Sequence, residues 1–178
     1  MKQLYIIRHC KAEGQAPDAP LTSEGQQEAQ ELQKFFEGKQ IDRIVSSPFK
    51  RAVDSIRPMA VEKEIPIEKD QRLKEWVLSG GPLVDWEDRL KQSFEDLDIC
   101  YEEGESGREA MTRGVSVLRE LLNSEANRIA VVTHGGLMTL ILHHFDSRFG
   151  FSDWANLMNP DVYRLAYNNT MYPEIQRI

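Results

Sequence analysis

Two short apolar segments of this 178-residue chain each lead directly into residues that do not belong in a protein core. The first is Leu4–Ile7, which Arg8 and His9 follow at once. The second is Ile129–Val132, which His134 follows after a single threonine. Short apolar runs rich in β-branched residues are typical of buried strands. The chain must therefore fold so that two buried strands end in cationic or titratable side chains.

Helical patterns alternate with these strands. Thr22 or Ser23 can cap a helix that Gly38 ends. Ser106 and Glu109 form the Ser-x-x-Glu capping box of a later helix. Strands that alternate with helices predict a three-layer α/β/α sandwich with a mainly parallel central sheet.

Two further strands are expected between these helices. Arg43–Val45 reads as a strand, and Ser47 with Pro48 is a suitable N-cap and first-turn pair for a helix that starts there. Pro58 is expected to end or kink that helix. Ile65–Glu68 is a short strand whose proline places it at a sheet edge.

The C-terminal segment "VYRLAYNNTMYPEIQRI" predicts a β-hairpin with Asn168 and Asn169 in the turn. At this length, residues 1–178 are expected to form one domain.

The composition excludes several classes of protein. A net charge of −7 provides no basic face for nucleic acid, and 40% hydrophobic residues with mixed charge are typical of a soluble globular protein. No apolar run approaches the roughly 20 residues of a membrane helix, and the first residues are too few for a signal peptide. We expect a cytoplasmic protein with no nucleic-acid or membrane partner. Cys10 and Cys100 are expected to be free thiols.

Residues 77–105 form a variable acidic segment, with nine acidic residues against two basic ones. One interpretation is a solvated surface. The other is an insertion that lies over a site and repels highly charged anions.

Five residues that can do chemistry fall at or just after the predicted strand ends, where α/β sheets bind ligands. Two arginines and two histidines suit a dianion such as a phosphoryl group, because guanidinium forks match its oxygens and an imidazole can attack phosphorus. Each residue alone is more often structural, and the ordered combination carries the prediction. The five are Arg8, His9, Arg51, Glu75 and His134.

Six segments, taken in order, resemble the histidine phosphatase superfamily, which includes the cofactor-dependent phosphoglycerate mutases. They are "IIRHCKAEG", "LTSEGQQEA", "IVSSPFKRAVDS", "RLKEW", "EGES" and "AVVTHGG". The resemblance implies the phosphoglycerate mutase-like form of the α/β/α sandwich. It also implies that His9 is the nucleophile and forms a phosphohistidine, with Arg8, Arg51, His134 and Gly135 around the phosphoryl group.

The resemblance further implies that Glu75 protonates the leaving alkoxide and then activates the water that breaks the phosphohistidine. No cofactor and no metal are needed, and the sequence has no cluster of acidic, Cys or His residues at metal-ligand spacing. The expected activity is a metal-independent phosphatase acting on a small phosphorylated metabolite. The alternatives are a phosphoglycerate mutase and a non-catalytic regulator that binds a phosphorylated ligand.

Departures from the family pattern favour the phosphatase over the mutase. Trp76 follows Glu75 where mutases have an arginine, and Gln15 occupies the approximate place of an asparagine.

Cys10 stands where a smaller residue is usual, and we expect it to fill a position where bulk would crowd the phosphate. Its pKa could be lowered by the nearby cations. Trp76 and Trp86 are candidates for the mouth of the site, which would suit an apolar or sugar-like leaving group.

Overall fold

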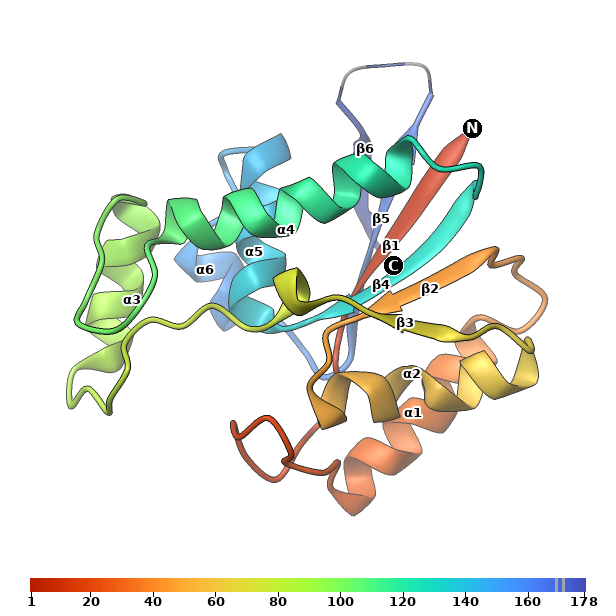
Figure 1. The fold of residues 1–178 in the computed structure, drawn as a ribbon, viewed down its shortest axis with the longest axis horizontal. Helices are drawn as coiled ribbons and strands as arrows, with labels where there is room; N and C mark the ends of the chain where they lie inside the picture. The colour runs from red at the N-terminus through yellow and green to blue at the C-terminus, as the bar shows by residue number, and fades with distance from the viewer. Residues whose placement is uncertain (169, 171) are drawn as a thin grey trace.

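A computed structural model describes residues 1–168, 170 and 172–178, and shows one six-stranded sheet with helices on both faces (Figure 1). The elements in chain order are β1 (Lys2–Arg8), α1 (Ser23–Phe35), β2 (Arg43–Ser46), α2 (Lys50–Glu62), β3 (Ile67–Lys69), the 3₁₀ turn η1 (Gln71–Leu73), α3 (Trp86–Glu95), α4 (Gly107–Leu122), β4 (Arg128–Thr133), α5 (Gly135–Phe145), α6 (Phe151–Ala155), β5 (Asp161–Tyr167) and β6 (Glu174–Arg177).

The strand order is β3-β2-β4-β1-β5-β6, and the first four strands are mutually parallel. β5 and β6 run antiparallel, which confirms the predicted C-terminal hairpin. Asn169 of the predicted turn lies outside the described residues. In the β1–β4 pair Arg8 is opposite Thr133, so the two strands end at the same edge and bring His9 and His134 together.

Both faces of the central strands are buried, which explains their unbroken apolar sequence. Leu4 and Ile6 pack with residues of α4 and α5, whereas Tyr5 and Ile7 pack with residues of α1 and α2. Figure 1 shows these two helical layers on opposite faces of the sheet. The prediction of a three-layer sandwich with a mainly parallel sheet is therefore confirmed.

The predicted start of α2 is wrong, and one of the two alternatives for Pro58 is excluded. The helix begins at Lys50 and not at Pro48. The Ser47 hydroxyl lies 2.8 Å from Nε2 of His134 and accepts from the N–H of Phe49 at 3.3 Å, so it closes a turn that precedes the helix. Pro58 does not end the helix, which continues to Glu62, and the alternative that Pro58 kinks it stays a prediction. Met59, next to the proline, is buried against the sheet, and this packing outweighs the single backbone hydrogen bond that proline removes.

The acidic segment 77–105 contains α3, a helix that the sequence reading did not predict. Eight of its nine carboxylate side chains are exposed and Glu105 is partly buried, so the carboxylates are solvated as the first interpretation expects. Leu78, Trp86 and Leu90 of the same segment line a cavity, as the second interpretation expects of an insertion that lies over a site. Leu90 and Phe94 of α3 are buried, whereas Val77, Val84 and Trp86 of the same segment are exposed. Among the described residues, no helix is both long and apolar enough to cross a membrane.

Candidate active site

His9 lies immediately after β1 with its ring orientation defined by two contacts. Its Nδ1 is 2.6 Å from the carbonyl oxygen of Cys10, which can only accept, so Nδ1 carries the proton and Nε2 holds the lone pair. Nε2 accepts a hydrogen bond of 3.2 Å from Nε of Arg51. Burial, aided by the charges of Arg51 and Arg8, lowers the pKa of His9 to about 4. The imidazole is therefore neutral near pH 7.

Arg51 is 1% exposed and connects α2 to the loop that follows β1. Its Nη1 donates to the carbonyl oxygens of Gln15 at 3.1 Å and Ala16 at 2.9 Å. The guanidinium lies 5.0 Å above the ring of Phe49. Burial lowers the pKa of this arginine, although the nearby carboxylate of Glu75 opposes the effect.

His134 follows β4 and is fully buried, with its ring centroid 5.0 Å from that of His9. Burial, with the positive charges around it, holds its pKa well below 6.5. Nε2 is 2.8 Å from the hydroxyl of Ser47, and Nδ1 is buried without a hydrogen-bond partner among the described residues. The Nε of Arg8 is likewise buried without a described partner. A buried nitrogen without a hydrogen-bond partner lowers the stability of the folded state unless a bound ligand supplies the partner.

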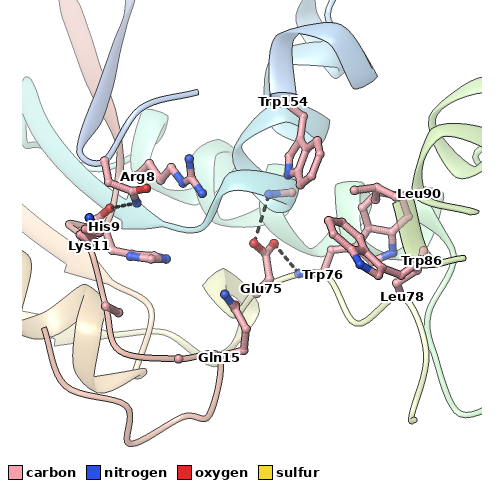
Figure 2. Close-up of a pocket in the computed structure, with 14 residues that line it drawn as sticks. Arg8, His9, Lys11, Gln15, Glu75, Trp76, Leu78, Trp86, Leu90 and Trp154 are labelled. Atoms are coloured by element: carbon pink, nitrogen blue, oxygen red, sulfur yellow. Dashed lines mark hydrogen bonds between the residues drawn. The ribbon is translucent and has the colours of Figure 1, made fainter. Parts of the chain in front are cut away.

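Glu75 accepts hydrogen bonds from three backbone amides, two of them at the N-terminus of α5. Figure 2 shows the bond from the Trp76 amide. Oε1 accepts from Trp76 N–H at 2.7 Å and from Leu137 N–H at 2.9 Å, and Oε2 accepts from Gly136 N–H at 3.1 Å. Free amides at a helix start favour a carboxylate there. A side chain at Gly136 would place Cβ only 2.8 Å from Oε1, so glycine permits this close approach.

A cavity of about 440 Å³ opens beside these groups. Arg8, His9 and Glu75 line it, so the structure brings three of the predicted residues to its wall. Arg51 and His134 contact His9 from the protein interior and do not line the cavity. Gly135 packs against Arg8, where a Cβ would lie 3.2 Å from Nε.

The sequence model of the histidine phosphatase superfamily (branch 1) matches residues 4–172, which is nearly the whole chain. This protein belongs to the histidine phosphatase superfamily. The recognition made from the six sequence segments is confirmed.

Solved structures support the same fold for this superfamily member. A mycobacterial glucosyl-3-phosphoglycerate phosphatase in complex with inorganic phosphate is 22% identical, with a TM-score of 0.79 over 100% of this chain and 96% of the other. A mutant phosphoserine phosphatase from Entamoeba histolytica in complex with phosphoserine is 22% identical, with a TM-score of 0.79 over 99% and 95%. No curated protein sequence matches the chain.

Cys10 does not have the environment that the sequence predicted. Cys10 does not line the cavity and packs instead with Leu21 and Ala29. Its N–H donates to the hydroxyl of Ser55 at 2.7 Å. Burial raises the pKa of the thiol to about 12, so the nearby cations do not lower it.

Arg113 on α4 is a site residue that sequence reasoning missed. Its Nη1 donates to the carbonyl oxygens of Arg72 at 2.6 Å and Lys74 at 2.8 Å, and its Nη2 donates to that of Glu75 at 3.1 Å. It also pairs with the carboxylate of Glu105. One guanidinium thus holds the loop that carries Glu75, and nothing in the local sequence marks it.

Ser47 and Asn159 were also missed. The Ser47 side chain resembles an ordinary helix cap in sequence, yet it contacts His134. Asn159 lies far along the chain, and its Nδ2 donates to the carbonyl oxygen of His9 at 2.8 Å. Among the residues that the structure describes, no group of three or more His, Cys, Asp or Glu side chains could hold a metal ion.

Proposed function

We propose that this protein is a metal-independent phosphatase that hydrolyses a phosphomonoester through a phosphohistidine on His9. The observation that carries the proposal is the state of that imidazole. The proton is held on Nδ1 by the Cys10 carbonyl, and burial keeps the ring neutral. The lone pair on Nε2 accepts from Arg51 in this structure, and it would attack phosphorus once a phosphoryl group takes over that arginine donor.

The surrounding donors suit the phosphoryl group. Arg8 lines the cavity and its Nε is buried without a described partner, so phosphoryl oxygens there would meet its guanidinium. His134, whose ring lies 5.0 Å from that of His9, is proposed to stabilise the phosphoryl group from behind His9. Arg51 donates to the reacting nitrogen and lies near the charge that develops in the transition state. Gly135 allows α5 to start close against Arg8.

Glu75 is proposed to serve in both half-reactions. In the first, Nε2 of His9 forms a bond to phosphorus while the ester P–O bond breaks, and a protonated Glu75 gives its proton to the departing oxygen. In the second, the Glu75 carboxylate takes a proton from water, whose oxygen attacks phosphorus. The P–N bond breaks, Nε2 regains its lone pair and phosphate leaves.

We further propose a small phosphorylated metabolite as the substrate, in a cytoplasmic enzyme of one domain, 1–178. Strands from both ends of the chain share one sheet, which supports the single domain. Solved structures of the same fold include complexes with phosphoserine and with 3-phosphoglyceric acid, which supports the substrate class. The mutase alternative is less well supported, because Arg8, His9 and Lys11 are the only basic residues described as lining the cavity.

The test is hydrolysis of p-nitrophenyl phosphate in the presence of a metal chelator. We expect turnover by the wild type and none by His9→Ala, with His144→Ala as the matched histidine control. Glu75→Gln should accumulate an acid-labile adduct of one phosphoryl group, visible by intact mass. Turnover unchanged in His9→Ala would contradict the proposal, whereas turnover that depends on His9 excludes a purely regulatory protein.

A further inference from the structure

The end of the cavity away from His9 has an aromatic wall (Figure 2). All three tryptophans of the sequence line it, together with two leucines. The five residues, here called the indole wall, are Trp76, Leu78, Trp86, Leu90 and Trp154.

Three separate segments of the chain build the indole wall, and aromatic packing fixes each part. Trp86 of α3 meets Trp154 of α6 edge-on, with ring centroids 6.0 Å apart. Trp154 stacks on Phe151 at 5.4 Å. Trp76 packs edge-on against Phe94 at 5.4 Å, and its Nε1 donates to a backbone carbonyl. These ring contacts and the Trp76 hydrogen bond hold the rings of the indole wall in place, so its surface has a defined shape.

Charge is confined to the other end of the cavity. Arg8, Lys11 and Glu75 are the formally charged residues described as lining it, and none belongs to the indole wall. The carboxylates of α3, including Glu87 and Asp88, are exposed to solvent. A second anionic group on the substrate would lose water at the indole wall without gaining a partner.

Trp86 leaves apolar surface in water. It is 48% exposed although its ring lies at the cavity, and a bound apolar group would remove that surface from solvent. Glu75 and Trp76 are adjacent in the chain and both line the cavity, so the wall is continuous with the phosphoryl site and an alcohol esterified to the phosphoryl group would reach it.

We propose that the preferred substrate is a phosphomonoester with a single phosphoryl group and an apolar aryl or alkyl alcohol that reaches Trp86 and Trp154. This inference rests on the proposed phosphatase activity and adds the chemical class of its leaving group. Lys11 and Gln15 lie at the charged end, so they can meet polar atoms next to the ester while the indole wall covers the apolar part.

The experiment compares phenyl phosphate with 2-naphthyl phosphate, whose leaving groups have similar acidity but different apolar area. We expect kcat/KM to be about tenfold higher for the naphthyl ester, mainly through KM, and lowest for 3-phosphoglycerate. In Trp86→Ala the naphthyl-to-phenyl ratio should fall toward one, and Trp86→Phe should restore most of it. Val61→Ala, an exposed apolar change on α2, is the matched control and should keep the wild-type ratio.

The outcomes separate the two proposals. No His9-dependent hydrolysis of any ester would contradict the phosphatase function itself. Hydrolysis of phenyl phosphate that depends on His9, with a wild-type naphthyl-to-phenyl ratio near one or with 3-phosphoglycerate preferred, would overturn only the leaving-group inference. The wild-type ratio needs no variant, so the test stands even where Trp86→Ala fails to fold.

Discussion

Arg51 donates a hydrogen bond from its Nε to Nε2 of His9 across 3.2 Å, although the two residues lie 42 positions apart in the sequence. The same guanidinium binds two carbonyl oxygens of the loop after β1. Arg51 therefore orients the proposed nucleophile and the loop beside it with one planar group. Its donor also lies where the oxygens of a phosphoryl group on Nε2 would be.

Replacing Arg51 by lysine keeps the charge and removes the planar fork. We expect kcat/KM for p-nitrophenyl phosphate to fall by about 10²–10³-fold, as when one donor to a transition-state charge is lost. Arg57→Lys, on the exposed side of the same helix, is the matched control and should behave as wild type. Circular dichroism verifies the fold. An Arg51→Lys variant as active as the control would contradict the assignment.

The pKa of His9 links the site to stability. Burial lowers it from 6.5 to about 4, so the unfolded chain takes up the proton first as pH falls. The contribution of the neutral His9 side chain to the free energy of unfolding is complete above pH 6.5 and is lost as the pH falls from 6.5 to about 4. At about 1.4 kcal/mol per pH unit, the loss is on the order of 3 kcal/mol.

His9→Gln removes this titration and leaves that of His134 in place. Its free energy of unfolding, measured by urea denaturation, should therefore decrease less than that of the wild type as the pH falls from 6.5 to about 4. Parallel curves for the two proteins would mean that His9 titrates normally in the folded state.

Gly136→Ala tests whether the position of the Glu75 carboxylate matters for activity. The added Cβ would lie 2.8 Å from Oε1, and the carboxylate, which three amides hold, would have to move. Alanine favours a helix over glycine by about 1 kcal/mol, so stability should be kept or increased while kcat falls. Gly81→Ala, whose Cβ meets nothing within 4 Å, is the control. Full activity with normal stability in Gly136→Ala would argue against a role for the Glu75 position.

Arg113 should act only through Glu75. A misplaced catalytic group can cost about 10²-fold in rate, and we expect a loss of up to that size in Arg113→Gln. Because both changes affect one group, Arg113→Gln should add little to Glu75→Gln in a double-mutant cycle. Arg119→Gln, exposed on the same helix, is the control. Fully additive losses would show that Arg113 acts independently of Glu75.

The two thiols should differ in reactivity. Burial raises the pKa of Cys10 to about 12, whereas Cys100 is exposed. A thiol reagent should therefore modify Cys100 alone in the native protein and both cysteines after denaturation. Cys10→Ala should retain most activity, since the thiol does not line the cavity. Rapid native labelling of a Cys100→Ser variant would contradict the burial of Cys10.

Local patterns determined much of this protein. Unbroken apolar runs specify strands buried on both faces, and Arg8, His9 and His134 follow such strands, so their place at one sheet edge could be predicted. The capping box of Ser106 and Glu109 is equally local and is present as predicted. The resemblance to the superfamily rests on the same short segments, and the match over residues 4–172 agrees with it.

Only the tertiary structure decided how these parts are supported and what surrounds them. Arg113 reaches the carbonyl of Glu75 from 38 positions away, and Trp86 meets Trp154 from a different helix. Tertiary packing also decided that Cys10 is buried away from the cavity and that Ser47 contacts His134. It likewise decided that α2 continues through Pro58. Such contacts depend on how helices pack against the sheet, and packing joins residues that no sequence spacing connects.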